Sequence, residues 1–223
     1  MTTMITATGA EYHFSSLSAL DPANRPVKIE DIAHMLSQIN RFHGACKRPY
    51  SVAEHSLFVS SIAERMDMPL SMQLCCLMHD AHECFTQDVS SPAKQAINFM
   101  SSVAGGTNAW TMFEDQHAKH LRARFGLSSA FAAHRHGIRT LDLVALATER
   151  RDLTAFDAAV HSPWAVLGDG SADSLRIVHP QAERLDTPER AAMAWTDWRD
   201  RFQDRFDELT YGIASAHGLD VTA

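Results

Sequence analysis

A short stretch of the chain, LCCLMHDAHECFTQD, combines an apolar run with closely spaced titratable side chains. It covers residues 74–88 and places His79, Asp80, His82 and Glu83 within five positions. Burying such a group without a partner costs several kcal/mol, so these side chains need a ligand or one another inside the fold. Imidazole and carboxylate groups are metal ligands, and the stretch therefore favours a metal centre.

Two other polar residues interrupt apolar helical stripes elsewhere in the chain. His55 lies between Val52 and Val59 on one stripe, and Asp142 is flanked by Leu141 and Leu143 on another. Neighbouring helices of a bundle can bring inward-facing side chains to a common centre. A nitrogen and oxygen ligand set of this kind suits a divalent ion such as Mn, Co, Fe or Zn. Each residue alone has a simpler interpretation, because a histidine on an apolar stripe is usually hydrogen-bonded core and a single aspartate is often a helix cap.

The order of these residues and the sequence segments around them resemble those of a known protein family. His55, the His79-Asp80 pair and Asp142 follow the H…HD…D order of the HD-domain phosphohydrolases. The segments INRFHGACKRPYSVAEHS, MHDAHECFTQDVSSPAK and LDLVALATERRDL are similar to the bacterial and prophage 5′-deoxynucleotidases of that superfamily. The similarity covers about residues 29–153, and a weaker similarity extends to the C-terminal helix. No G-Y-P sequence is present, which speaks against the branch that acts on cyclic dinucleotides.

The resemblance implies a role for each matching residue. His55, His79, Asp80 and Asp142 match the ligands of a divalent ion, which would be Mn, Co, Fe, Zn or Mg. Glu83 matches the acidic residue that handles the nucleophilic water.

Three further matches concern the substrate. Arg41 and Phe42 match an Arg-aromatic pair that holds the nucleotide and crowds the ribose 2′ position, and Asp88 matches a residue near the sugar 3′-hydroxyl. Without the resemblance they would be a surface arginine, a core aromatic and a helix-end carboxylate.

Two positions depart from the family pattern. Ala45 stands where relatives often carry histidine, so one polar contact near the site is absent. His82 replaces a smaller residue, and it either faces solvent or contacts phosphate or a second ion.

The expected function is removal of the 5′-phosphate from deoxyribonucleoside monophosphates. The alternatives are a deoxynucleoside triphosphohydrolase, because the same ligands can present water to the α-phosphorus, and a catalytically silent nucleotide- or metal-binding module. The expected partner is a small nucleotide, and relatives favour a homodimer.

The composition of the chain further restricts the possible partners and the expected location of the protein. The chain has 223 residues, 45% of them hydrophobic, and a formal net charge of −7. This acidic balance speaks against a nucleic-acid polymer as partner. No apolar run approaches the ~20 residues of a membrane span, the N-terminus lacks the features of a secretory signal, and the four cysteines form no C-x-x-C pair. We therefore expect a cytoplasmic protein with reduced core thiols.

The elements that must position the site are expected to be helices. Apolar spacing predicts helices over 28–42, 52–66, 72–85 and 138–153, and a helix capped by Asn108 that ends at Gly126. Thr187-Pro188 predicts the start of a C-terminal helix over 187–210. Small strands are expected over 12–20 and 175–178, the latter in a long loop over 157–186. The expected fold is all-α with these minor strands, as a single domain over 1–223 whose core spans about 28–155.

Overall fold

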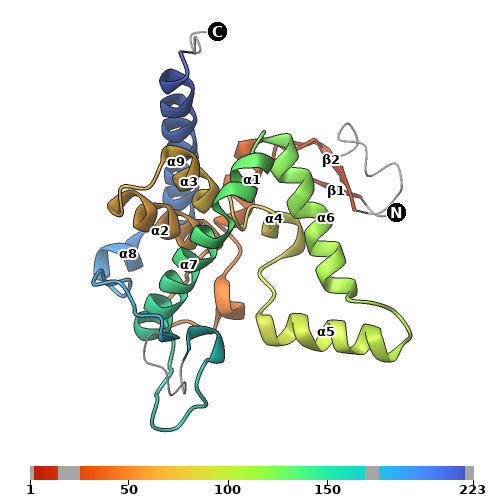
Figure 1. Ribbon diagram of the computed structural model, residues 1–223, viewed down its shortest axis with the longest axis vertical. Helices are drawn as coiled ribbons and strands as arrows, with labels where there is room; N and C mark the ends of the chain where they lie inside the picture. The colour runs from red at the N-terminus through yellow and green to blue at the C-terminus, as the bar shows by residue number, and fades with distance from the viewer. Residues whose placement is uncertain (1–2, 15–25, 169–175, 219–223) are drawn as a thin grey trace.

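The computed structural model describes residues 3–14, 26–168 and 176–218. Helices form most of this structure, with one antiparallel pair of short strands, β1 (Thr3–Ile5) and β2 (Glu11–His13) (Figure 1). The expected all-α fold with minor strands is confirmed. The helices are α1 (Ile29–Leu36), α2 (Val52–Arg65), α3 (Leu70–Leu77), α4 (Glu83–Thr86), α5 (Ser91–Val103), α6 (Ala109–Arg124), α7 (Ser128–Leu153), α8 (Pro188–Ala192) and α9 (Trp195–Ala216).

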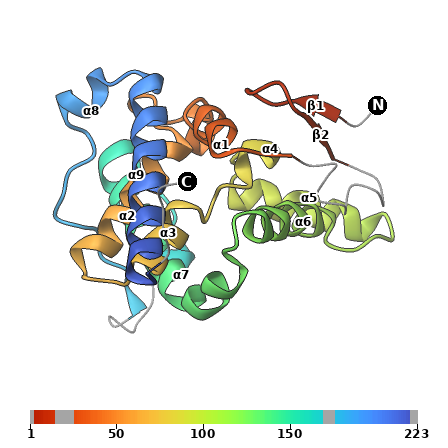
Figure 2. The same cartoon turned by 90° about the horizontal axis from the view of Figure 1, so that it is seen from above.

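The core lies where α2 packs against α3, α7 and α9. Helix α2 begins as its sequence requires, because the Ser51 hydroxyl accepts a hydrogen bond from the Glu54 amide at 3.1 Å. Val52, Val59 and Ile62 of α2 are buried. Helix α9 covers α1, α2 and α3, and Figure 2 shows it crossing them. The helical body thus surrounds the side of α2 that carries His55.

The helix expected over 28–42 is shorter than predicted. Helix α1 ends at Leu36, and residues Arg41–Gly44 form a separate 3₁₀ turn. The chain leaves the helix because it pairs with the segment before α2: the Arg41 amide donates to the Tyr50 carbonyl at 2.8 Å, and Asn40 bridges to Ser51. This pairing fixes the Arg41-Phe42 segment in a position that helical spacing does not predict.

The helix expected over 72–85 is also interrupted. Helix α3 ends at Leu77, α4 begins at Glu83, and turns connect them. The amide of Ala81 donates to the Met78 carbonyl at 3.2 Å, which is a turn bond and not a bond of a continuing α-helix. In a straight helix, adjacent residues point in directions about 100° apart. The turn instead allows His79 and Asp80 to reach the same point.

Helices α5 and α6 form a hairpin that extends from the body (Figure 1). Helix α5 begins at Ser91, in a segment for which no helix was predicted, and proline lies in its first turn. Asn108 and Gly126 flank α6 as predicted, and Gly126 has φ +68°, a conformation that glycine adopts without strain. The hairpin brings one side of α6 toward α7.

Three further expectations differ in detail. Helix α7 begins at Ser128, ten residues before the predicted start. The C-terminal helix is divided, because α8 ends at Ala192 and α9 begins at Trp195; Thr187 caps α8 by accepting from the Arg190 amide. Residues 15–20 of the predicted N-terminal strands lie outside the described residues, and the observed pair is β1–β2.

The strand expected over 175–178 is wrong for the described residues 176–178, which form no strand. A hydrogen bond from the Val178 amide to the Leu167 carbonyl, 2.9 Å long, connects this segment to the 3₁₀ turn Ala165–Leu167. Over the ranges that the structure describes, no helix is both long and apolar enough to cross a membrane.

Candidate metal centre

His55 is the innermost of the predicted ligands. It lies on α2, its side chain is fully buried, and its Nδ1 atom lies 2.5 Å from Oε1 of Glu149 on α7. The same oxygen accepts a hydrogen bond from the hydroxyl of Tyr50 at 2.8 Å. Tyr50 holds Glu149, and Glu149 in turn orients the imidazole ring so that its Nε2 faces Asp80 and Asp142.

His79 and Asp80 come from the turns between α3 and α4. Nδ1 of His79 lies 2.8 Å from the carbonyl oxygen of Cys76. A carbonyl can only accept, so Nδ1 of His79 carries the hydrogen and Nε2 presents a lone pair when the ring is neutral. This hydrogen bond directs Nε2 of His79 toward His55.

Four atoms from three parts of the chain converge at this point. Nε2 of His55 lies 3.2 Å from Nε2 of His79, 3.5 Å from Oδ2 of Asp80 and 3.4 Å from Oδ1 of Asp142. Nε2 of His79 lies 3.2 Å from Oδ2 of Asp80 and 3.7 Å from Oδ1 of Asp142. The ligand atoms of His55, His79 and Asp80 all lie within 4.8 Å of one another, and Asp142 joins this group through its contacts with both histidines.

The chemistry of this donor set fits a bound cation. Both Nδ1 atoms already donate hydrogen bonds, so the two neutral imidazoles and the two carboxylates of Asp80 and Asp142 present four lone pairs to one another. Ligands about 2.1 Å from an ion are about 3.0 Å apart in octahedral and about 3.4 Å apart in tetrahedral geometry. The observed separations fall in and near this range. His55, His79, Asp80 and Asp142 could therefore hold one divalent ion.

The charges in the cluster compensate one another strongly. Burial alone would lower the pKa of His79, but Asp80 and Asp142 raise that pKa well above its usual value. Burial alone would raise the pKa of both carboxyls, yet the histidines lower it well below the usual value for Asp80 and also lower it for Asp142. A proton on His79 thus supplies positive charge at the place where a metal ion would supply it.

Glu83 lies one turn of chain beyond His79 and is almost fully buried. Burial raises the pKa of its carboxyl well above the usual range, and the nearby charges of Asp80 and Asp88 raise it further. Its Oε2 atom is buried and has no hydrogen-bond partner among the described residues. A buried carboxyl with a raised pKa and a free oxygen is a candidate for proton exchange with a ligand.

Arg41 lies beside the cluster and contacts two of its carboxylates. Its guanidinium lies 3.5 Å from Oδ2 of Asp80 and 3.3 Å from Oε2 of Glu149. Burial would lower the pKa of this guanidinium, but Glu149, Asp88 and Asp80 raise it. Its buried Nε has no partner in the described part of the chain. The alternative interpretation of Arg41 as a surface arginine is therefore wrong, because the residue is buried.

Phe42 does not continue the apolar face of α1. It has φ +53°, it is half-buried, and its ring centroid lies 6.2 Å from that of Trp164. The guanidinium carbon of Arg41 lies 5.6 Å from the centroid of the Phe42 ring. Phe42 thus lies at the rim of the site beside Arg41, and it is not part of the buried core cluster.

The two residues that depart from the family pattern, Ala45 and His82, differ in their exposure. Ala45 is exposed. His82 is buried, not solvent-facing, and its Nε2 lies 3.4 Å from Oε1 of Glu114 on α6. Lys94 on α5 contacts the same oxygen at 2.5 Å. His82, Glu83 and Glu114 are close enough to share an ion, but Lys94 already places a positive charge on Glu114.

Sequence patterns alone missed several residues around the centre. Glu149 is the clearest case, since the spacing of seven from Asp142 places both on the same face of α7 and could have identified it. A cavity of about 650 Å³ opens beside the centre. It is lined by His79, Asp80, His82, Lys94, Glu114, Asp115, Ala118, Arg122, Phe131, Arg135, His136, Ile138, Arg139 and Asp142.

The fold and this centre define a helical protein with a buried imidazole–carboxylate cluster beside an open cavity. No family model matches the sequence. The chain is 29% identical over 177 residues to uncharacterized protein YfdR of Escherichia coli strain K12, covering 79% of this chain and 85% of that protein. It is 31% identical over 170 residues to uncharacterized protein RCAP_rcc00048 of Rhodobacter capsulatus, covering 72% of this chain and 82% of that protein. The chain belongs to the same protein family as the R. capsulatus protein.

Proposed function

We propose that the chain is a metal-dependent phosphohydrolase of the HD-domain type that removes the 5′-phosphate from deoxyribonucleoside monophosphates. The convergence of four lone-pair donors from His55, His79, Asp80 and Asp142 is the observation that supports it most directly. The order of these residues in the sequence, and the segments around them, add the resemblance to 5′-deoxynucleotidases.

The four side chains would hold one divalent ion. When bound, such an ion polarises a phosphate oxygen and lowers the pKa of its water toward neutrality. Asp80 and Asp142 are the more accessible ligands, with side chains 18% and 25% exposed, whereas His55 is fully buried. Substrate would therefore approach from the side of Asp80 and Asp142.

Glu83 would act as the base that accepts or orients the proton of the attacking water. Burial and the charges of Asp80 and Asp88 raise its pKa above the usual carboxyl range, and its Oε2 has no partner among the described residues; both observations support this role. Glu83 follows the turn that carries Asp80, so it would lie near the bound ion without being one of its four ligands.

Arg41 would bind the phosphate. A guanidinium forms paired, charge-assisted hydrogen bonds with phosphate oxygens, and such donors stabilise the charge that develops during transfer. Its unpartnered Nε supplies a donor for this contact, while Glu149 anchors the other side of the group.

Phe42 and Asp88 would contact the sugar. The ring of Phe42 at the rim beside Arg41 would exclude a ribose 2′-hydroxyl by steric contact, and Asp88 would accept from the 3′-hydroxyl. Asp88 lies close enough to Arg41 and Glu83 to influence the pKa of both, which supports its assignment to the proposed sugar contacts.

A screen of phosphate release tests this function. The protein is loaded with Mn²⁺, Co²⁺ or Mg²⁺ and offered deoxy- and ribonucleoside mono- and triphosphates, with His79→Ala as the inactive control. We expect inorganic phosphate and deoxynucleoside from monophosphates. A catalytically silent module would bind metal or nucleotide and release neither product. Triphosphate release from deoxynucleoside triphosphates would instead support the triphosphohydrolase.

A further inference from the structure

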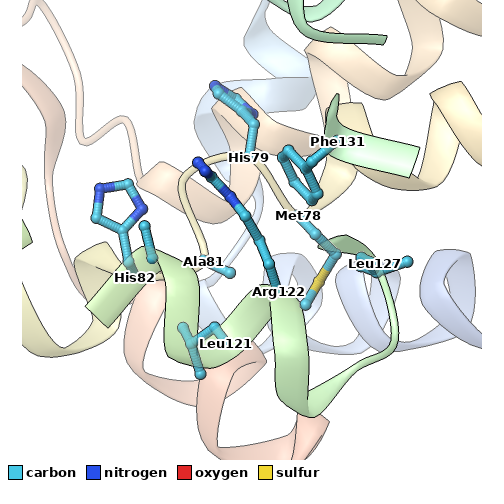
Figure 3. Close-up of a pocket in the computed structure, with 9 residues that line it drawn as sticks. Met78, His79, Ala81, His82, Leu121, Arg122, Leu127 and Phe131 are labelled. Carbon is cyan, nitrogen blue, oxygen red and sulfur yellow. The ribbon is translucent and has the colours of Figure 1, made fainter. Parts of the chain in front are cut away.

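Two aromatic side chains beside the metal centre differ in how they are covered. Phe131 of α7 lines the cavity and is buried. Figure 3 shows the side chain of Arg122 extending from α6 beside this ring, and its guanidinium carbon lies 4.5 Å from the ring centroid. Phe42 is instead half-buried at the rim, beside Arg41. Phe42 is therefore the ring that a bound sugar can meet, as the proposed function requires.

The backbone around Phe42 adopts a conformation that needs support. Phe42 has φ +53° and His43 has φ +52°, so two consecutive residues with side chains lie in the left-handed region. The Cβ atom disfavours this region, and such a conformation persists only where the surrounding structure holds it. A hydrogen bond from the Arg41 amide to the Tyr50 carbonyl, 2.8 Å long, fixes the start of the segment. This bond holds the backbone but does not set the direction of the Phe42 ring.

The Phe42 ring is held by a cluster of aromatic and guanidinium groups. Its centroid lies 6.2 Å from that of Trp164, with the ring planes 35° apart. The guanidinium carbon of Arg150 lies 5.5 Å from the Trp164 ring centroid. The ring of Phe156 meets Trp164 at 69° with the centroids 5.8 Å apart. Contacts between aromatic rings, and between a guanidinium and a ring, are attractive at these distances. Trp164 thus connects the rim of the site to the C-terminal end of α7.

Trp164 is fixed by the turn that follows it. Its carbonyl accepts a hydrogen bond from the Leu167 amide at 2.8 Å, at the 3₁₀ turn Ala165–Leu167. The Leu167 side chain is fully buried, and the turn packs against α7. The ring that supports Phe42 is therefore attached to the helix that also carries Asp142 and Glu149.

We propose that Trp164 is a positioning residue for the selection of deoxyribose, because it holds the Phe42 ring where that ring excludes a ribose 2′-hydroxyl. The proposal rests on the proposed function and adds a residue outside the segments that resemble 5′-deoxynucleotidases, which end at Leu153. Trp164 acts through Phe42 and not on the nucleotide itself. Without the Trp164 ring, Phe42 can turn away from the sugar, and ribonucleotides gain access to a metal centre that is otherwise unchanged.

Nucleotide selection and the position of the Phe42 ring are measured on the same variants of the full chain, loaded with Mn²⁺. Trp164→Leu removes the ring, and Trp164→Phe keeps an aromatic ring. Trp164→Met is a second variant without a ring, which keeps the test valid if Trp164→Leu impairs folding. Trp195→Leu is the matched control, because Trp195 is an exposed tryptophan of α9 that contacts His34 of α1.

Two readouts are recorded for each variant. The first is kcat/KM for dAMP and for AMP, together with the metal content. The second is fluorine NMR of protein labelled with para-fluorophenylalanine, in which Phe42→Leu identifies the Phe42 signal. The NMR readout does not depend on hydrolysis.

We expect Trp164→Leu to lower the ratio of kcat/KM for dAMP over AMP by about fivefold or more, through a higher kcat/KM for AMP. The kcat for dAMP and the metal content should change less than about twofold, because the ligands and Arg41 stay in place. The Phe42 signal should shift in Trp164→Leu and stay in place in Trp195→Leu. Trp164→Phe should restore the ratio to within about twofold of the wild type. A merely structural loss would affect both nucleotides equally and leave the ratio unchanged.

Phe42→Ala combined with Trp164→Leu tests whether the effect passes through Phe42. We expect the double variant to have the ratio of Phe42→Ala alone, because residues that act as one unit are not additive. Additive effects, or an unchanged ratio in folded Trp164→Leu or Trp164→Met, would overturn the proposal. If the wild type hydrolyses no nucleotide, the proposed function is rejected, and an unshifted Phe42 signal in Trp164→Leu would then overturn the positioning role on its own.

Discussion

Nδ1 of His55 lies 2.5 Å from Oε1 of Glu149, a residue two helical turns beyond Asp142 on α7. One helix therefore provides both a candidate ligand and the carboxylate that orients another. Groups that orient a metal-bound histidine typically contribute 10–100-fold to metal affinity.

The first prediction follows from this contact. Glu149→Gln keeps the shape of the side chain but removes the negative charge that holds His55 and Arg41. We expect roughly 10–100-fold weaker binding of Mn²⁺, measured by competition with a chelating dye. Glu30→Gln, an exposed change on α1, is the control. Equal metal affinity in Glu149→Gln and the wild type would remove Glu149 from the centre.

The second prediction concerns pH. In the metal-free protein Asp80 and Asp142 raise the pKa of His79 well above its usual value, and the pKa of His55 is raised as well, so protons occupy the cluster near neutral pH. An ion must displace these protons, and its apparent affinity should therefore fall as pH decreases.

Calorimetry in two buffers of different ionisation enthalpy measures the protons released. We expect release at pH 7 that declines as the pH rises through the pKa of His79. The same protonation stabilises the metal-free fold below the unfolded-state pKa of about 6.5, and this stabilisation is lost as pH rises through the folded-state value. Metal uptake at pH 7 without proton release would contradict this account.

The third prediction separates catalysis from metal binding. Glu83→Gln should lower turnover by roughly 10²-fold or more, the usual range for a positioned acid or base, and leave the metal content nearly unchanged. Turnover of dAMP and metal analysis are measured on the same preparation. Parallel loss of metal and activity would make Glu83 a ligand.

The fourth prediction concerns selection of deoxyribose. Phe42 lies outside the core cluster, so Phe42→Ala should cost less stability than the ~3–5 kcal/mol typical of a buried phenylalanine. The ratio of kcat/KM for dAMP over AMP should fall at least tenfold, about 1.4 kcal/mol.

Phe156→Ala is the matched control for Phe42→Ala, because Phe156 also contacts the Trp164 ring, at 5.8 Å. An unchanged ratio in folded Phe42→Ala would assign the selection of deoxyribose to other residues.

The sequence predicted much of the site because its ligands break apolar stripes. His55 between Val52 and Val59, and Asp142 beside Leu141, stand out locally, and packing of α2 against α3 and α7 brings them together. Glu149 was missed because it lies next to two arginines near a helix end, where a glutamate is ordinarily a solvated residue. Only the tertiary fold shows that it is fully buried.

The interrupted helices were less predictable. The apolar spacing over 72–85 is compatible with one helix, and the turn that joins His79 and Asp80 at one centre depends on contacts with α2 and α7. The pairing of Asn40 with Ser51, which ends the first helix early, likewise joins segments that helical periodicity treats separately. The cavity between α6 and α7 depends on the placement of a whole hairpin, and no local pattern encodes it.

A metal titration tests the central claim most directly. Chelator-treated protein is titrated with Mn²⁺ while bound metal and phosphate release from dAMP are measured together, with His79→Ala and Asp80→Ala as site variants and the exposed His217→Ala as control. We predict that activity rises in parallel with occupancy, reaches a plateau at one ion per chain, and is absent with the bound metal in both site variants. Phosphate release without bound metal, or full occupancy in His79→Ala or Asp80→Ala, would contradict the account.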